Sequence, residues 1–184
     1  YVGVDSARSL IDIDAKVDGD PHHTYLEASA TRPIKGIRKD FTHVTFILSL
    51  QNMEYLSHAL KNAAEHLKQD GMMLLVLNHP AFRIPRQSGW GEHPNKLQYR
   101  WINKYMSFMK IPITMHPGAK QSAVTTSYHY PLSDYSKMLF DEGFVIERIE
   151  EWCSDRESAG KAARMENRAR AEFPLFMAIV ARKR

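Results

Sequence analysis

FTHVTFILSLQNMEYLSHALKNAAEHLKQDGMMLLVL, residues 41–77, is the segment that most restricts the architecture of this 184-residue chain. Residues 41–50 are rich in β-branched and aromatic side chains and end almost continuously apolar, which is typical of a strand buried on both faces. Residues 54–69 place apolar side chains at helical spacing, and Gly71 stands where a helix C-terminal cap is expected. Residues 72–77 (MMLLVL) predict a second buried strand. Strand, helix and strand in this order predict a right-handed βαβ unit and a parallel sheet.

Shorter elements flank this unit. Before it, residues 1–5 (YVGVD) and 24–30 (TYLEASA) predict strands, with a weak helix around Leu10, Ile11 and Ile13 between them. After it, the pattern predicts a helix at 133–142 closed by Gly143, a strand at 144–152, a charged helix at 156–172 and a last apolar strand at 174–181. This alternation of strands and helices predicts an α/β domain.

The segment between residues 78 and 130 lacks such a pattern. It contains several prolines and eight aromatic residues, which are Phe82, Trp90, Tyr99, Trp101, Tyr105, Phe108, Tyr128 and Tyr130. A long irregular segment inside a compact domain is usually functional or disordered, and aromatic enrichment argues against disorder. We therefore expect a lid or substrate-binding insertion at about residues 79–130.

Length and composition restrict the class of protein. The 184 residues predict one domain, and 43% apolar with 25% charged residues is typical of a soluble globular chain. The sequence shows no membrane span and no signal peptide, and its single cysteine, Cys153, fits a reducing compartment, so we expect a cytoplasmic protein. The net charge of +4 permits an anionic partner without requiring one.

Asp5 is the first candidate functional residue, because it ends the first predicted strand. Ligands of doubly wound sheets bind beyond the carboxyl ends of the strands, where a carboxylate accepts hydrogen bonds from both hydroxyls of a ribose. An aspartate that ends a strand is also frequently a turn residue or a helix N-cap. The residue alone leaves both interpretations open.

The order and spacing of these segments resemble the class I S-adenosylmethionine-dependent methyltransferases, specifically the small type-11-like group, over nearly the whole chain. YVGVDSARSLI resembles the family's second strand with its ribose carboxylate, TYLEASA the third strand, and FTHVTFILSLQNM the fourth strand, whose end lines the methionine part of the cofactor. LKQDGMMLLVLNHP resembles the fifth strand. HYPLSDYSKMLFDEGFVIERIEEW and FPLFMAIVARK resemble the late helix and the final antiparallel hairpin, which ordinary dinucleotide-binding Rossmann domains lack.

This resemblance implies a Rossmann-like α/β fold, with a mostly parallel sheet and a C-terminal antiparallel hairpin. It also implies methyl transfer from S-adenosylmethionine to an unidentified small-molecule acceptor. Carried onto this sequence, the cofactor-binding residues are Asp5 for the ribose, Ser6, Ser29 and Ala30 for the adenine edge, and Leu48, Ser49 and Asn52 for the methionine end.

The chain also departs from the family. The family's first strand and glycine-rich loop have no counterpart here, and in the family that strand lies between the second and the fourth. We therefore expect an N-terminally truncated single domain, residues 1–184, with a gap in its sheet and weakened folding or cofactor binding. Ser29 stands where the family often has an acidic residue that pairs with the adenine amine. Its hydroxyl can accept one such bond but carries no charge.

Methyl transfer from a sulfonium is a displacement from an activated donor, so the protein mainly aligns the reactants and excludes water. A general base helps only where the acceptor loses a proton, and His79, directly after the strand at 72–77, is the catalytic candidate. A turn histidine bonded to local backbone is the alternative for His79. The expected substrate-binding residues are His79, Phe82, Trp90, Tyr99, Trp101, His116 and His129. Histidine spacing matches no compact metal-ligand motif, so no metal is expected.

Three other functions stay open at this point. The first is a non-catalytic or cofactor-deficient Rossmann-like binding module, and the second is an NAD-dependent oxidoreductase whose ribose Asp5 would hold. The third is a nucleic-acid methyltransferase that uses the basic residues of segment 156–170. We favour a solvated helix with ion pairs such as Glu166–Arg170 for that segment. The sequence does not determine the oligomeric state.

Overall fold

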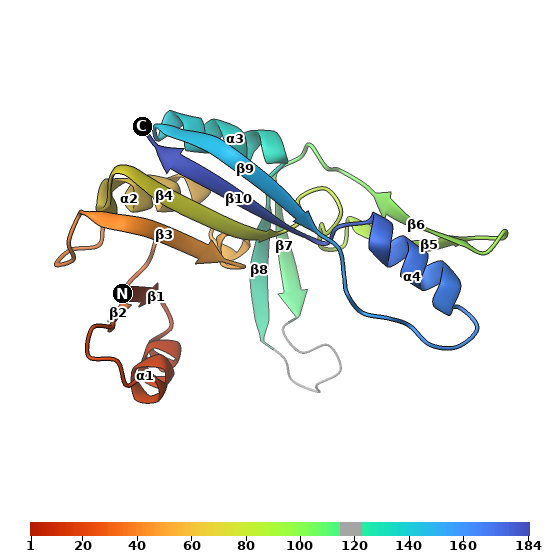
Figure 1. Ribbon diagram of the computed structural model, residues 1–184, viewed down its shortest axis with the longest axis horizontal. Coiled ribbons are helices and arrows are strands. Elements are labelled where there is room, and N and C mark those ends of the chain that lie inside the picture. The colour runs from red at the N-terminus through yellow and green to blue at the C-terminus, as the bar shows by residue number, and fades with distance from the viewer. Residues whose placement is uncertain (115–122) are drawn as a thin grey trace.

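The computed structural model describes residues 1–114 and 123–184 (Figure 1). Its helices are α1 (Arg8–Val17), the 3-10 turn η1 (Leu50–Asn52), α2 (Leu56–His66), α3 (Leu132–Asp141) and α4 (Ala163–Glu172). Its strands are β1 (Val2–Asp5), β2 (Thr24–Glu27), β3 (Phe41–Ile47), β4 (Leu67–Asn78), β5 (Ser88–His93), β6 (Leu97–Ile102), β7 (Met109–Thr114), β8 (Val124–His129), β9 (Phe144–Trp152) and β10 (Phe176–Lys183).

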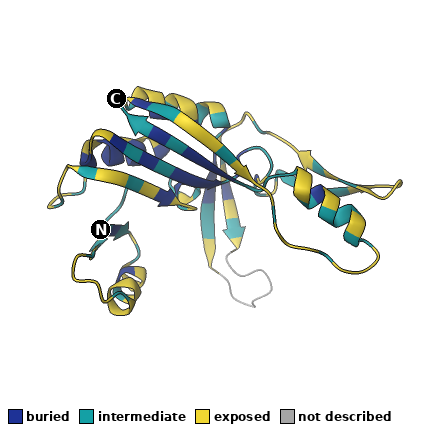
Figure 2. Cartoon of the chain, in the orientation of Figure 1, coloured by how far each residue is buried: buried dark blue, intermediate teal, exposed yellow. Residues whose placement is uncertain are grey.

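The main sheet has the strand order β3-β4-β10-β9 (Figure 1). β3 and β4 are parallel, whereas β10 lies between β4 and β9 and is antiparallel to both. The predicted parallel unit and the predicted C-terminal antiparallel hairpin are therefore confirmed. The core lies between this sheet and the helices α2 and α3, where Leu60, Leu75, Leu139 and Ile179 are fully buried (Figure 2).

β1 and β2 form a separate parallel sheet of two strands, with Val2 opposite Thr24. Within residues 1–114 and 123–184, β3 pairs only with β4, so its other edge has no β-partner. Among the described residues the main sheet therefore ends at β3, and β1 and β2 do not join it. Contact with the main body runs instead through α2, where the Asn62 side-chain amide donates hydrogen bonds to the carbonyls of Ala30 (3.0 Å) and Arg32 (2.9 Å).

Apolar side chains lie uncovered on α1 and at the end of β3. On α1, Leu10, Ile13 and Val17 follow helical spacing along the helix and are 50%, 55% and 82% exposed. Ile47, the last residue of β3, is 55% exposed. Side chains of this kind are normally buried when they line one side of an element. Further protein that covered α1 or the end of β3 would therefore bury apolar surface.

The prediction that Gly71 closes the helix at 54–69 is wrong. α2 ends at His66, and Gly71 lies within β4. Between the pairs Phe41–Leu67 and His43–Met72 the register shifts, so residues 68–71 bulge out of the ladder. A Cβ atom on Gly71 would lie 2.9 Å from the carbonyl oxygen of Lys68. Glycine is needed here for close backbone approach inside the bulge, not for a cap.

The segment predicted to be irregular, residues 78–130, contains two antiparallel hairpins, β5–β6 and β7–β8. The β5–β6 hairpin shows no strand pattern in the sequence because its glycines face aromatic residues across the hairpin. Gly89 lies opposite Trp101, and Gly91 lies opposite Tyr99. A Cβ atom on either glycine would lie within 2.7 Å of the facing ring. The aromatic rings thus cover the glycine backbone instead of forming an apolar stripe.

The last helix is shorter than predicted. Residues 156–172 were expected to be helical, but α4 begins at Ala163 because Ser158 folds back onto it. The backbone N–H of Ser158 donates to the Asn167 side chain (2.8 Å), and its hydroxyl contacts Glu166 and Arg170. The expected Glu166–Arg170 ion pair is present at 3.4 Å.

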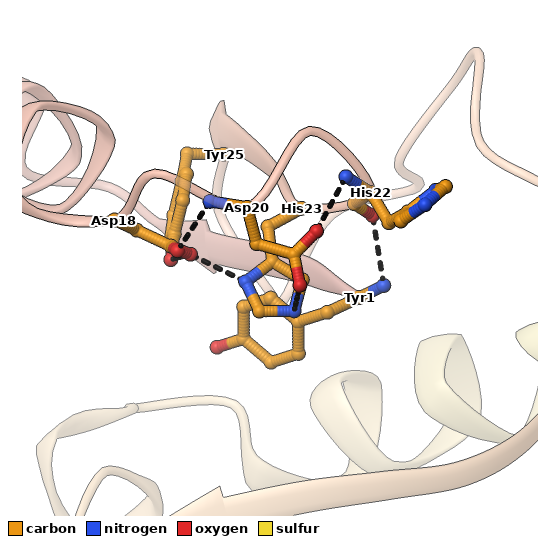
Figure 3. A network of polar contacts seen from close by, with 6 residues as sticks. All are labelled: Tyr1, Asp18, Asp20, His22, His23 and Tyr25. Atoms are coloured by element: carbon orange, nitrogen blue, oxygen red, sulfur yellow. Dashed lines mark hydrogen bonds and ion pairs between the residues drawn. The ribbon is translucent and has the colours of Figure 1, made fainter.

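Asp18 is the centre of a polar network that closes the β1–α1–β2 unit (Figure 3). Its carboxylate accepts hydrogen bonds from the Tyr25 hydroxyl, the His23 ring and the backbone N–H of Asp20. The hydrogen bond from Tyr25 is the largest of the causes that lower the pKa of Asp18 to about 2. The same bond raises the pKa of Tyr25 to about 12. The network therefore favours a charged carboxylate and a neutral phenol.

The Tyr25→Phe variant should raise the pKa of Asp18 towards its ordinary value, because the main hydrogen bond to the carboxylate is lost. A lowered folded-state pKa stabilises the fold above the unfolded pKa, and this stability is lost as the pH falls through about 2. The variant should thus be less stable than the wild type above about pH 4 and equal to it at the acid end. NMR titration of the Asp18 carboxyl measures the shift, with Tyr55→Phe as the control. An unchanged Asp18 pKa in Tyr25→Phe would contradict the assignment.

Candidate functional site

The candidate site lies at the carboxyl ends of β3 and β4. Since these strands are parallel, Leu48 and Asn78 end up at the same edge of the sheet. Leu48 has a φ of 50°, a left-handed conformation that costs a non-glycine residue about 1 kcal/mol or more. It is held there because its N–H donates to Val76 O (2.9 Å) and its carbonyl accepts from Gln51 Nε2 (2.7 Å). Non-glycine residues in this conformation are enriched at functional sites, and among the described residues Asp70, Arg86, Lys96 and Lys104 share it.

A small cavity of about 20 Å³, which we call the tyrosine cavity, opens beside this turn. Its walls include Gln51, Asn78, Pro80, Arg83, His129, Tyr128, Tyr130 and Tyr135. Gln51 Oε1 is buried and is the one side-chain N or O atom of the described chain that is buried without a hydrogen-bond partner. A buried acceptor left without a donor costs about 1–3 kcal/mol. A donor group on a bound molecule would relieve that cost.

His129 is the best-placed titratable group in the tyrosine cavity. It is 5% exposed, and its Nε2 lies 2.7 Å from the backbone carbonyl of Tyr105. A carbonyl only accepts, so Nε2 carries the proton and Nδ1 carries the lone pair. Burial lowers the pKa of His129, partly offset by the hydrogen bond to Tyr105. The side chain is therefore a neutral imidazole at pH 7 whose tautomer is fixed by the backbone.

A larger cavity of about 320 Å³, the arginine cavity, adjoins the first and shares Asn78, Arg83 and Pro85 with it. Arg100 and Ser88 complete its polar wall, and Ile84 and Ile113 belong to its apolar wall. Partial burial lowers the pKa of both Arg83 and Arg100, and the charge of Arg83 lowers that of Arg100 further. Two cationic side chains are thus held near one hollow.

His79, the predicted general base, has both ring nitrogens engaged by the protein. Its Nδ1 accepts hydrogen bonds from the backbone N–H groups of Ala81 (3.1 Å) and Phe82 (3.3 Å). Its Nε2 therefore carries the proton and donates to Glu151 Oε1 (2.7 Å). The catalytic role of His79 stays a prediction, but these contacts favour the structural alternative, a turn histidine that caps local backbone.

The His79→Leu variant should lower the free energy of unfolding by about 1–3 kcal/mol, because two partly buried N–H groups lose their acceptor. Glu151→Gln is the matched control, since an amide oxygen still accepts from Nε2, and it should cost under about 1 kcal/mol. Urea denaturation of the purified proteins measures both values. Equal stability of His79→Leu and the wild type would contradict the capping role.

The predicted cofactor residues fall into two groups. Asp5, Ser6, Ser29 and Ala30 belong to the β1–α1–β2 unit and the segment after it, and Leu48, Ser49 and Asn52 follow β3. Asp5 Oδ1 accepts a hydrogen bond from the backbone N–H of Ala7 (2.7 Å), so the turn interpretation of Asp5 is observed. Asp5 Oδ2 has no partner among the described residues. The Ser29 hydroxyl hydrogen-bonds Thr31 (2.9 Å), and Ala30 packs against the core.

The structure does not gather all of the aromatic residues predicted for the substrate. Phe82 and Trp90 both contact Phe173, with ring centres 5.8 and 5.7 Å apart. Tyr99 and Trp101 lie on the opposite face of the β5–β6 hairpin, because side chains alternate along β6 and Arg100 pairs with Trp90. None of these four aromatic residues lines either cavity. His116 lies outside the described residues.

Two further observations concern the part of the chain that the structure describes. No group of three or more His, Cys, Asp or Glu side chains there is arranged to hold a metal ion. None of its helices has the length and apolar character needed to cross a membrane.

The chain resembles known proteins in its structure, whereas the sequence comparisons found no match. No protein-family model matches the chain, and no curated protein matches it. Among solved structures, an S-adenosylmethionine-dependent methyltransferase from Mesorhizobium loti superposes with a TM-score of 0.75 at 21% identity, covering 99% of this chain and 79% of that one. A protein from Listeria monocytogenes assigned to the same class gives 0.77 at 18% identity, over 100% and 79% of the two chains. The chain has the fold of a class I S-adenosylmethionine-dependent methyltransferase.

A third structure with this methyltransferase fold, the glycopeptide N-methyltransferase MtfA, is complexed with S-adenosylmethionine. It superposes with a TM-score of 0.59 at 15% identity and covers 100% of this chain and 72% of that one. Within the methyltransferase fold of this chain, the cavity walls add residues that the sequence did not suggest as site residues, which are Gln51, Asn78, Arg83, Arg100, Tyr128, Tyr130 and Tyr135. Of these, Asn78 carried a usable signal because it directly follows the predicted strand at 72–77, and Tyr128 and Tyr130 because they belong to the aromatic-rich segment.

Proposed function

We propose that this protein binds S-adenosylmethionine and transfers its methyl group to a small-molecule acceptor whose reacting group lies at the tyrosine cavity. The observation that carries this proposal is the juxtaposition of the left-handed Leu48 turn with that cavity, at the carboxyl edge of a sheet with the methyltransferase fold. In such sheets this edge is where ligands bind. The complex of MtfA with S-adenosylmethionine supports the choice of cofactor.

The cofactor residues keep the roles expected from the sequence. Asp5 Oδ2 is free to accept from the ribose hydroxyls, while Oδ1 holds the turn. Ser6, Ser29 and Ala30 border the adenine, and the backbone of Leu48 and Ser49, with Asn52, borders the methionine end. S-adenosylmethionine itself supplies an activated methyl group, so the residues of this chain bind, orient and exclude water.

His129 takes the role of general base in this proposal. Its neutral imidazole lines the tyrosine cavity with Nδ1 as the lone-pair atom, whereas both nitrogens of His79 are occupied. A base of this kind removes the proton from a hydroxyl or amine acceptor as the new bond to carbon forms. The three tyrosines of the cavity wall exclude water from the reacting atoms.

Calorimetric titration with S-adenosylmethionine and its demethylated product, S-adenosylhomocysteine, tests the proposed cofactor. Saturable binding of both is expected. NADH serves as the comparison ligand for the oxidoreductase alternative. If NADH binds and neither S-adenosylmethionine nor S-adenosylhomocysteine does, the proposal is overturned. If none of the three ligands binds, the cofactor-deficient binding module is favoured.

We also infer that a further strand pairs with the open edge of β3, between β3 and β1. The unpartnered edge and the exposed Ile47, Leu10, Ile13 and Val17 support this. The segment at about 79–130, whose described residues include the β5–β6 and β7–β8 hairpins, acts as the substrate-binding insertion of the same domain. In a protein that carries this further strand, amide hydrogen exchange in β3 should be slower and cofactor binding tighter than in the 184-residue chain. Unchanged exchange in β3 would contradict the added strand.

A further inference from the structure

We propose that the acceptor carries an oxyanion group, a carboxylate or a phosphate, and that Arg83 and Arg100 bind it in the arginine cavity. The inference rests on the proposed function, because it describes the molecule that receives the methyl group. It is carried by the two guanidinium groups at one hollow of about 320 Å³.

Neither arginine has a carboxylate partner. Five other arginines, Arg8, Arg38, Arg148, Arg170 and Arg182, each lie within 4.0 Å of an Asp or Glu oxygen. The remaining arginines have no such ion pair among the described residues either, but they line neither cavity. No such contact involves Arg83 or Arg100 in residues 1–114 and 123–184, and residues 115–122 (MHPGAKQS) contain no acidic residue. Two like charges near each other and partly removed from water are unfavourable unless an anion neutralises them. The arrangement therefore suits an anionic ligand.

Arg100 is held in position before any ligand arrives. Its Nε donates to the carbonyl of Phe82 (2.6 Å), and its Nη2 donates to the Ser88 hydroxyl (3.0 Å). Its guanidinium carbon lies 4.9 Å from the centre of the Trp90 ring. These contacts occupy one edge of the guanidinium and leave Nη1 without a partner among the described residues. An arginine fixed in this way loses little conformational entropy when it binds an oxyanion.

Arg83 is the more accessible of the two. Its guanidinium carbon lies 4.5 Å from the centre of the Phe176 ring, and no hydrogen bond from its side chain occurs in the described structure. More than a third of the residue is exposed to solvent. All of its donors are thus available to a ligand that enters from solvent. A guanidinium fork matches the two oxygens of a carboxylate or a phosphate.

The arginine cavity and the tyrosine cavity share part of their walls. Asn78 and Arg83 line both cavities, and His129 and Gln51 line the tyrosine cavity. A small molecule anchored by its oxyanion at Arg83 and Arg100 can therefore direct its nucleophile towards His129. The pair of arginines would fix orientation, and the apolar wall of Ile84 and Ile113 would accept the carbon skeleton.

The test is calorimetric titration of the protein with inorganic phosphate in one arm and benzoate in the other, each in the presence and absence of saturating S-adenosylhomocysteine. Saturable binding of at least one oxyanion is expected. Arg83→Met and Arg100→Met should each weaken oxyanion binding by about 10–100-fold, because each variant loses at least one charge-assisted hydrogen bond. Arg86→Met, a charge removal three residues along the same loop, should change the affinity by under about twofold.

Arg100→Lys accompanies Arg100→Met because it keeps the charge if the methionine variant unfolds. It should bind more weakly than the wild type, because an ammonium cannot reproduce the fork. The stronger of the two arms identifies the oxyanion. Absence of saturable binding in both arms, or equal losses in Arg86→Met and the two cavity variants, would overturn the inference. Binding of S-adenosylhomocysteine without oxyanion binding rejects this inference alone. Oxyanion binding without S-adenosylhomocysteine binding rejects the proposed function and retains the anion site.

Discussion

Replacing His129 by asparagine should lower the rate of methyl transfer by about 10²–10⁴-fold, the usual contribution of a general base. An asparagine amide can still donate towards the carbonyl of Tyr105, which His129 approaches to 2.7 Å, so the fold should be largely retained. It has no lone pair of comparable basicity, so the acceptor must lose its proton to water. The rate is measured as release of S-adenosylhomocysteine, with an acceptor selected from small carboxylates and phosphates.

The matched control is His66→Asn. His66 is also buried and also contacts a backbone carbonyl, that of Arg38 at 3.0 Å, but it lies in α2 and lines neither cavity. It should lose stability without a comparable loss of rate. Because burial lowers the pKa of His129, the rate of the wild type should rise with pH through a midpoint below about 6.5. Retention of that acid limb in His129→Asn would exclude His129 as the base.

Replacing Asp5 by alanine should weaken S-adenosylhomocysteine binding by about 100-fold or more, because each hydrogen bond to a charged group contributes about 1.5–3 kcal/mol. Asp5→Asn separates the two roles of this residue. In the wild type, Asp5 Oδ1 accepts a hydrogen bond from the N–H of Ala7 at 2.7 Å. The amide oxygen of asparagine can accept the same bond, so the turn is kept while the charge is lost. Asp5→Asn should therefore weaken binding by about 10–100-fold and leave the melting temperature nearly unchanged.

The control for both Asp5 variants is Asp12→Asn on the neighbouring helix α1, whose carboxylate pairs with exposed Arg8 at 2.9 Å. It removes the same charge and should alter the affinity by under about twofold. Calorimetry gives the affinities and thermal denaturation gives the stabilities. If Asp5→Asn binds like the wild type while Asp5→Ala unfolds, Asp5 is a turn residue only.

Most of the main sheet was predictable, because β4 and β10 are almost continuously apolar, β3 is rich in β-branched and aromatic residues, and α2 and α3 carry an apolar stripe. The strand at 144–152 was predicted with the bounds that β9 has. The boundary between α2 and β4 was not predictable, since β4 begins at Leu67 and residues 68–71 form a bulge that depends on the partner strand β3. The β5–β6 hairpin was missed because one face of β5 is glycine, covered by Trp101 and Tyr99 of the partner strand. Patterns within one strand do not contain that cross-strand information.

The candidate site was predictable only where one residue ends an element. Leu48 and Asn78 follow buried strands, so their common edge follows from topology. The different hydrogen-bonding states of His79 and His129 do not follow from topology. They depend on Glu151 and on the carbonyl of Tyr105, which are distant from the two histidines in sequence. Arg83 and Arg100 carry no signal as single residues. Their meaning comes from the absence of an acidic neighbour, which only the folded chain reveals.

The junction through Asn62 has a kinetic consequence. The β1–α1–β2 unit carries Asp5, and among the described residues no β-ladder joins it to the main sheet, while Asn62 holds Ala30 and Arg32 by two hydrogen bonds. A cofactor that contacts both Asp5 and the Leu48 turn would clamp the unit against the sheet before the acceptor enters. Steady-state turnover should therefore follow compulsory order, with S-adenosylmethionine first and the acceptor second.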